Sequence, residues 1–171
     1  MKKIILFVLP GFDIGGTTVS TRNLLSLLQK DGYECWVMPL WPRGAMLHLY
    51  DGVKRVELPF TLNAFLAPSL KEIPTLVDRL LAAAIRFLCN HSARFERWIL
   101  GKGLNKVISE YHIDTIIAEQ ENFTTQLVSF AKCDNKVAWI RCDYKRYFED
   151  RQFKKEGFYQ EFNSIVCVAD Q

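Results

Sequence analysis

The chain has 171 residues, of which 49% are hydrophobic and 24% are charged, and its formal net charge is +3. This globular composition excludes disordered, collagen-like and disulfide-scaffold proteins, and the length suits one ordinary domain. The mild positive charge also argues against nucleic acid as a partner, since nucleic-acid-binding proteins usually carry a clustered basic face.

The first 40 residues predict a strand, a loop, a helix and a second strand. The basic start and the apolar run Ile4–Leu9 resemble the first half of a signal peptide, but the run is short and no A-x-A cleavage site follows, so we expect a buried strand. Gly15 and Gly16 follow, and the leucine spacing in residues 17–31 is helical, with Ser and Thr as candidate caps. Residues 33–40 complete a βαβ unit, whose strands are parallel.

The middle of the chain is less regular. Residues 53–59 could form a short strand, and residues 61–73 are expected to lack regular structure. From Thr75 to about Leu100 the pattern predicts one helix, which Gly101 and Gly103 interrupt. Two stripes run along this helix. The apolar stripe comprises Leu81, Ile85, Leu88, Phe95 and Ile99, and the basic stripe comprises Arg79, Arg86, Arg94 and Arg97.

The rest of the chain alternates predicted helices and strands. Helices are expected at 104–111 and 122–131, and strands at 115–119, 136–140 and 164–169. About five or six parallel strands alternating with helices indicate an open, doubly wound α/β sheet with helices on both faces. The sequence therefore predicts a Rossmann-like fold in a single domain that spans residues 1–171.

Ligands of such sheets bind beyond the carboxyl ends of the strands, so the loops there are the candidate sites. The first loop is the most informative. Gly15, Gly16 and Thr17 lie at the start of a helix, where exposed amides and the helix dipole favour an anion such as a diphosphate. The G-x-G-x-x-G fingerprint and a Walker lysine are absent, which argues against dinucleotide enzymes and P-loop NTPases. A tight turn that binds nothing is the alternative.

Two further loops carry polar groups. At the end of the strand at 115–119 and just beyond it, Glu119, Gln120 and Asn122 suit sugar hydroxyls, and Glu119 with Glu121 also resembles a glycosidase pair. The alternative is a solvated polar loop.

After the strand at 136–140, Arg141 could bind a phosphate or carboxylate, Asp143 could act as a base, and Tyr144 could stack on a sugar ring. Here too a solvated loop is the alternative. No histidine has the spacing of a metal ligand, so no metal is expected.

The cysteines and the basic stripe indicate the cellular compartment of the protein and whether it contacts a membrane. An odd number of cysteines, five, without C-x-x-C spacing or a signal peptide is typical of a reducing cytoplasm. No stretch approaches the roughly 18 uncharged apolar residues of a membrane span. The basic stripe could lie on the inner face of an anionic membrane, or the helix could simply pack on its own core.

Three segments carry a resemblance to a known family. KKIILFVLPGFDIGGTTVSTRNLLSLLQKDGYECWVMPL resembles the opening of family-4 retaining glycosyltransferases of the two-domain B-type fold. NKVAWIRCDYKRYF resembles the W-I-H-x-D-Y segment of this family, and NSIVCVADQ resembles the strand that closes its N-terminal sheet. The likeness covers both ends of the chain and hardly touches residues 44–100.

The resemblance implies the acceptor-binding half of an enzyme that uses a nucleotide sugar and no other cofactor. The family's second domain binds the donor and carries an E-x7-E motif, which this chain lacks, so the chain looks like one piece of a longer enzyme. By position, Gly15 and Gly16 would lie near the donor diphosphate, and Asp143 matches the family's aspartate. Arg141 stands where the family usually has histidine, and arginine cannot act as a base at neutral pH.

The sequence thus predicts part of a hexosyltransferase that transfers sugar to a glycan or lipid-linked acceptor, in the synthesis of a surface polysaccharide. On this hypothesis the isolated chain is nearly inactive. Two alternatives stay open. One is a non-catalytic sugar- or partner-binding α/β domain, and the other is a nucleotide-binding enzyme such as an epimerase, against which the missing glycine fingerprint speaks.

Overall fold

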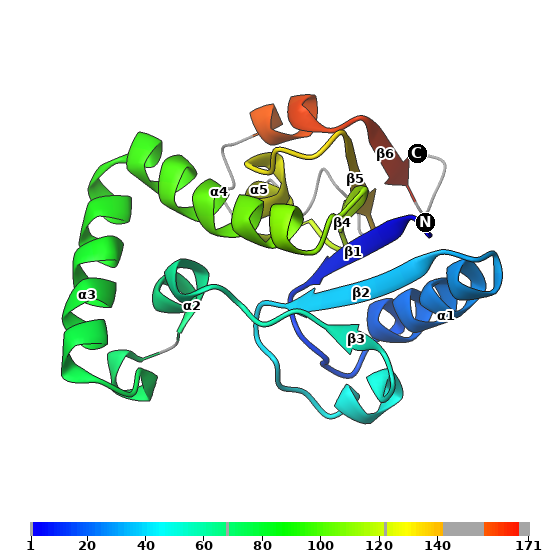
Figure 1. Ribbon diagram of the computed structural model, residues 1–171, viewed down its shortest axis with the longest axis horizontal. Helices are drawn as coiled ribbons and strands as arrows, with labels where there is room; N and C mark the ends of the chain where they lie inside the picture. The colour runs from blue at the N-terminus through cyan, green and yellow to red at the C-terminus, as the bar shows by residue number, and fades with distance from the viewer. Residues whose placement is uncertain (1, 68, 122, 142–155, 168–171) are drawn as a thin grey trace.

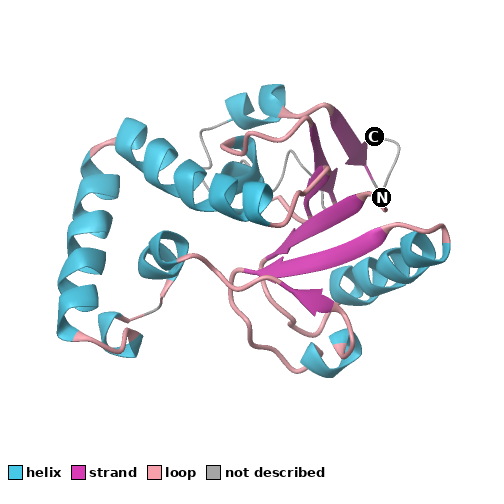
Figure 2. Ribbon diagram, viewed as in Figure 1, coloured by secondary structure: helices cyan, strands magenta, loops and turns pink. Residues whose placement is uncertain are grey.

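The computed structural model describes residues 2–67, 69–121, 123–141 and 156–167. Its centre is a six-stranded sheet in the order β3-β2-β1-β4-β5-β6 (Figures 1 and 2). The strands are β1 (Ile4–Leu9), β2 (Glu34–Pro39), β3 (Lys54–Arg55), β4 (Thr115–Ala118), β5 (Asn135–Ile140) and β6 (Ser164–Cys167). All five neighbouring pairs are parallel. This is the Rossmann-like, doubly wound sheet that the sequence predicts.

Helices cover both faces of the sheet. The α-helices are α1 (Gly16–Lys30), α2 (Phe60–Leu66), α3 (Leu76–His91), α4 (Ala93–Glu110) and α5 (Phe123–Ser129). Three short 3-10 helices are η1 (Leu47–Tyr50), η2 (Leu70–Glu72) and η3 (Glu156–Glu161). In Figure 1, α1 and η1 lie on one side of the sheet and α4 and α5 on the other.

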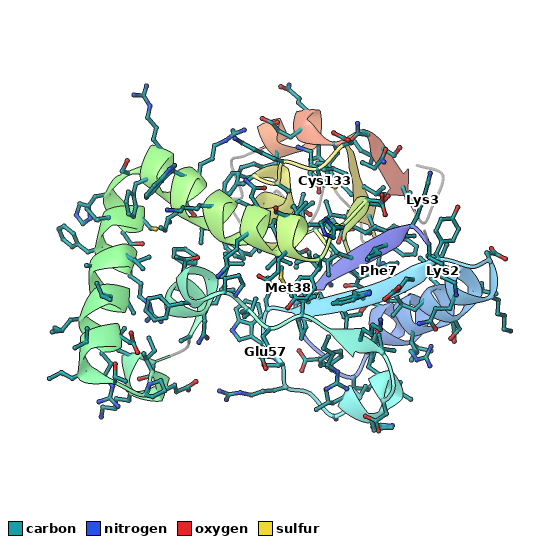
Figure 3. The ribbon with its side chains drawn as sticks, in the orientation of Figure 1. Lys2, Lys3, Phe7, Met38, Glu57 and Cys133 are labelled. Carbon is teal, nitrogen blue, oxygen red and sulfur yellow. The ribbon has the colours of Figure 1, made fainter. Side chains whose placement is uncertain are left out.

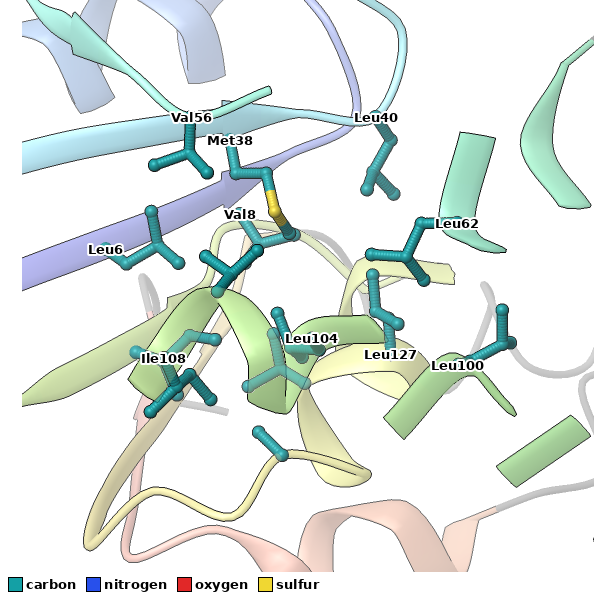
Figure 4. Close-up of a cluster of buried hydrophobic side chains, with 14 of the residues drawn as sticks. Leu6, Val8, Met38, Leu40, Val56, Leu62, Leu100, Leu104, Ile108 and Leu127 are labelled. Atoms are coloured by element: carbon teal, nitrogen blue, oxygen red, sulfur yellow. The ribbon is translucent and has the colours of Figure 1, made fainter. Parts of the chain in front are cut away.

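The side chains of strand β1 alternate between the two faces of the sheet and contribute to a hydrophobic core on each face. Leu6 and Val8 point into the larger cluster, where Met38 of β2 meets Leu104 of α4 and Leu127 of α5 (Figure 4). Ile5, Phe7 and Leu9 of β1 point to the opposite face of the sheet. There they belong to a smaller cluster, together with Leu25 of α1 and Tyr50 of η1. A continuous apolar run is what a strand covered on both faces needs.

The structure corrects the predicted middle of the chain. Residues 61–73 contain α2 and η2, where we expected no regular structure. The expected helix over 75–100 is two helices that meet at Ser92, whose hydroxyl accepts a hydrogen bond from the Phe95 amide and caps α4. The second of these helices continues through both glycines to Glu110.

The two glycines of α4 serve close packing instead of ending the helix. A Cβ on Gly103 would lie 2.4 Å from Thr61 Oγ1 of α2, and a Cβ on Gly101 would lie 3.1 Å from the Phe130 carbonyl oxygen. Glycine at these positions therefore lets α4 approach α2 and the end of α5 closely. The sequence pattern could not distinguish this use from a helix break.

The basic stripe does not form one free surface. Arg86 Nε donates to the Ala64 carbonyl at 2.7 Å and Arg79 Nε to the Ile73 carbonyl at 2.7 Å, so both satisfy the ends of short helices. Arg97 pairs with Glu161 at 2.7 Å, while Arg94 is exposed. Three of the four arginines thus hold the helical layer together.

We expect Arg86→Gln to lower the free energy of unfolding by about 1–3 kcal/mol, because α2 loses donors for its final carbonyl groups. The exposed Arg94 supplies the matched control, and Arg94→Gln should change stability by less than about 0.5 kcal/mol. Denaturant unfolding followed by circular dichroism measures both. Equal losses in the two variants would contradict the role of Arg86 in the fold.

Candidate functional site

The order of the sheet reverses between β1 and β4, and the loops that follow these two strands meet there. The loop after β1 leads into α1, and the loop after β4 begins at Glu119. A hollow of about 240 Å³ lies between them, and its lining includes Asp13, Gly15, Thr17, Tyr50, Glu119 and Gln120. The sequence placed Gly15, Thr17, Glu119 and Gln120 at strand ends, and the structure brings these four together.

The N-terminus of α1 opens on this hollow. Gly15 is the N-cap residue, and no side chain of the described residues caps the helix, so the prediction of a Ser or Thr cap is wrong. The first turn also has no acidic residue. A Cβ built on Gly16 would meet nothing within 4 Å, so this position has room for a side chain. Such a helix end has amide groups and a partial positive charge to offer an anion.

A second segment fixes the shape of the glycine loop. The Phe12 amide donates to the Arg43 carbonyl at 3.0 Å, and the Phe12 carbonyl accepts from the Met46 amide at 3.0 Å. Gly44 lies between these contacts with φ +136°. A Cβ there would lie 2.1 Å from the Phe12 carbonyl oxygen, so only glycine fits. The loop after β1 is therefore held against the loop after β2.

A buried ion pair adjoins the hollow through Glu119 and joins the ends of β4 and β5 to α1. Glu119 Oε1 lies 3.5 Å from Arg141 Nη1, and the two side chains are only 4% and 5% exposed. The same carboxylate accepts a hydrogen bond of 2.6 Å from the Thr21 hydroxyl. The Arg141 guanidinium stacks 3.8 Å from the centre of the Trp139 ring. Buried charges of this kind persist only when they are paired and hydrogen-bonded.

The guanidinium of Arg141 is engaged on several sides. Nη1 donates to the Thr17 carbonyl at 3.1 Å and also to the Ser20 hydroxyl, and Nη2 donates to the Thr21 hydroxyl at 2.9 Å. These bonds tie the end of β5 to the first turns of α1. Arg141 therefore holds the walls of the hollow in place, and this placement makes it a positioning residue.

Burial shifts the ionisation of the groups around the hollow. It raises the pKa of Glu119, against the hydrogen bond from Thr21 and the charge of Arg141, which lower it. Burial also raises the pKa of Tyr50 to about 12, and the Glu119 charge adds to this rise. The Tyr50 hydroxyl stays protonated at neutral pH and donates to the Thr18 carbonyl at 2.8 Å.

A second, larger hollow of about 550 Å³ lies at the carboxyl ends of β2 and β3. Its lining combines Trp41 and Leu58 with the polar residues Glu57, Asn63 and Arg43. Figure 3 labels Glu57 in the segment between β3 and α2. An aromatic ring beside carboxylate, amide and guanidinium groups can hold a ring with polar substituents. The loop after β2 is thus a second candidate position for a ligand.

Some predicted site residues cannot be placed. Asn122, Asp143 and Tyr144 lie outside the described residues. Thr21 and Tyr50, in contrast, belong to the site although sequence reasoning missed them. Thr21 lies one turn of α1 beyond Thr17, which is the one signal that could have identified it, and Tyr50 carries no signal because it lies 32 residues from its partner Thr18.

The chemistry of the main hollow combines hydrogen-bond acceptors and donors. Asp13 and Glu119 supply carboxylate oxygens, and the start of α1 supplies amides. Carboxylate oxygens accept hydrogen bonds from sugar hydroxyls, and the amides donate hydrogen bonds to phosphate oxygens. In the described part of the chain, no cluster of three or more His, Cys, Asp or Glu could hold a metal ion.

Neither the models of known protein families nor the curated proteins contain a match to this sequence.

Proposed function

We propose that this chain is the acceptor-binding half of a cytoplasmic glycosyltransferase of the two-domain B-type fold, which moves a hexose from a nucleotide sugar to a glycan or lipid-linked acceptor of a surface polysaccharide. One observation carries the proposal. The uncapped glycine start of α1 opens on the same hollow that Glu119 and Gln120 line from the loop after β4. An anion site and a hydroxyl-binding wall side by side suit a sugar that is leaving a diphosphate.

The roles of the residues follow from this arrangement. Gly15, Gly16 and Thr17 face the diphosphate of the donor, and Glu119 and Gln120 bind acceptor hydroxyls. Asn122 and Tyr144 are proposed for the acceptor and Asp143 for catalysis on the resemblance alone. Arg141 orients Glu119 and the first turn of α1 through the contacts described above. The donor site is then completed by the chain's own C-terminal domain, with no further cofactor.

We expect Gly16→Asp to weaken the binding of uridine diphosphate and inorganic pyrophosphate at least about tenfold, because a carboxylate then occupies the anion site. The same change should leave the free energy of unfolding unchanged or raise it by about 0.3–1 kcal/mol, since an acidic residue in the first turn of a helix is favourable. Equilibrium titration measures the first effect and thermal unfolding the second.

The neutral variant Gly16→Asn separates charge from size, because both side chains enter open space. It should retain more affinity than Gly16→Asp. If all three proteins bind pyrophosphate equally, the anion does not bind at the start of α1 and the proposed role of the glycine loop is wrong.

A non-catalytic sugar-binding domain is the second candidate function, and the buried position of Arg141 favours it. Arg141 does not line the hollow, and its guanidinium is bonded to α1 instead of facing a ligand. The sequence that follows Gln171 in the gene separates the two candidates. A downstream domain with an E-x7-E motif supports the transferase, and its absence supports a binding domain.

A further inference from the structure

Helix α3 turns its apolar side outward. Six large apolar side chains of this helix are between 44% and 70% exposed, namely Leu76, Val77, Leu80, Leu81, Phe87 and Leu88. Their spacing of three, four and seven residues places them on one face. Leu81 and Leu88 belong to the stripe that the sequence analysis marked as apolar, and they contact solvent instead of the core. Exposed apolar side chains gathered on one face of a helix are typical of an interaction site.

The inward side of α3 carries polar groups that lock this orientation. Arg79 and Arg86 donate to backbone carbonyls of η2 and α2, as described above. Ala82 and Cys89 are the buried residues of this helix. Turning the helix to bury its leucines would break these bonds and leave carbonyls at two helix ends without donors. The outward apolar face is therefore the stable arrangement of the isolated chain.

The position of α3 suits contact with an extended surface. The helix lies at the edge of the molecule, beyond α2 and far from the sheet (Figures 1 and 2). Its 16 residues give it a length of about 24 Å. The apolar face runs from Leu76 to Leu88, so the helix can lie flat along most of its length.

The charge around α3 indicates which kind of partner surface this helix contacts. Residues 71–106 contain seven Lys and Arg but three Asp and Glu, so their net charge of +4 exceeds the +3 of the whole chain. The acidic side chains already have partners in the protein, because Glu72 pairs with Arg43, Asp78 bonds Thr75 and Glu96 bonds Gln126. Exposed Lys71 and Arg94 lie just beyond the two ends of α3. This surplus is complementary to an anionic partner.

We propose that α3 docks the protein on an anionic lipid bilayer, with its apolar face among the upper acyl chains and Lys71 and Arg94 at the headgroups. A leucine- and phenylalanine-rich face flanked by Lys and Arg is the pattern of helices that lie in the membrane interface. Exposed Trp98 of α4, with the Lys102 ammonium 5.3 Å from its ring, adds an aromatic and a basic group on the neighbouring helix. The proposal does not depend on the proposed enzymatic function.

Among the described residues, no helix has the length and apolar character needed to cross a bilayer.

Vesicle flotation tests the proposal. The wild-type chain should float with vesicles of phosphatidylglycerol and phosphatidylcholine, and only weakly with phosphatidylcholine alone. Leu80→Gln/Phe87→Gln should lower the bound fraction at least about tenfold, because two inserted side chains become polar. Lys71→Glu/Arg94→Glu should also lower it at least about tenfold and remove its salt dependence. Leu27→Gln is the matched control, since Leu27 of α1 is 57% exposed and should not matter.

Three results would overturn the proposal. The first is equal flotation of the wild type and the two double variants, and the second is equal binding to neutral and anionic vesicles. The third is a dimer that Leu80→Gln/Phe87→Gln dissociates while vesicles bind nothing, which would assign the face to a second copy. The lipid comparison uses the wild type alone, so it holds even if a variant fails to fold, and circular dichroism shows whether one does.

Discussion

Arg141→Ala is expected to lower the free energy of unfolding by about 3–5 kcal/mol, because it leaves the buried carboxylate of Glu119 without its charged partner. The variant also loses the bonds that join β5 to Thr17, Ser20 and Thr21 of α1. In a domain of this size, each kcal/mol corresponds to about 2–4 °C in the melting temperature. Thermal unfolding at neutral pH measures the loss.

The exposed pair Arg43–Glu72 supplies the control. Its atoms are closer, at 2.8 Å, but its side chains are 71% and 42% exposed. Water and salt screen such a pair, so Arg43→Ala should cost less than about 1 kcal/mol. If the two alanine variants lose similar stability, burial does not decide the strength of the Glu119–Arg141 pair.

The pH dependence of the Arg141→Ala loss has a definite sign. Burial raises the pKa of Glu119 in the folded chain, so the folded protein holds this proton at pH values where the unfolded chain has released it. Stability from this group is full below the ordinary glutamate pKa and falls as the pH rises through the folded value. Without Arg141 the pKa rises further. The difference between wild type and variant should therefore shrink as the pH is lowered toward about 4.

Gly44→Ala is expected to destabilise the chain by at least about 3 kcal/mol, since a left-handed backbone conformation and a collision with backbone combine. The new Cβ would lie 2.1 Å from the carbonyl oxygen of Phe12 and 2.8 Å from the amide nitrogen of Asp13. The glycine loop would have to move away from its partner segment. Denaturant unfolding measures the cost, and titration with pyrophosphate measures the effect on the site.

Gly52→Ala isolates the contribution of the collision. Gly52 has φ +78°, and a methyl group added to it would meet nothing within 4 Å. It should lose only the conformational cost of about 1–2 kcal/mol and retain full affinity for pyrophosphate. A Gly44→Ala protein as stable as Gly52→Ala would show that the contact with the glycine loop is not constraining.

The fold could be predicted because all strands but β3 are short, largely apolar runs separated by turn residues. Ile4–Leu9 and the strand ending at Ile140 needed no tertiary information. The helical layer was predicted less well, since periodicity shows that a helix has two faces but not which face is inside. The carboxyl ends of η2 and α2 require hydrogen-bond donors, and Arg79 and Arg86 of α3 turn inward to supply them.

The strand-end positions of the candidate residues could be predicted, but their contacts could not. Topology alone placed Gly15, Glu119 and Arg141 at strand ends on one edge of the sheet. The interaction of Arg141 with Thr17 and Thr21 spans more than a hundred positions and follows from the packing of α1, which no local pattern encodes. The sequence therefore predicted a ligand for Arg141, and the structure shows hydrogen bonds from its guanidinium to α1.

An amide NMR titration tests the central claim, that the loops after β1 and β4 form one sugar-phosphate site. The labelled chain is titrated with uridine diphosphate, then with a simple sugar glycoside. We predict that the diphosphate shifts the amides of residues 15–18 most and that the sugar shifts those around Glu119 and Gln120. Shifts centred on Trp41 and the second hollow, or no shifts at the start of α1, would contradict the account.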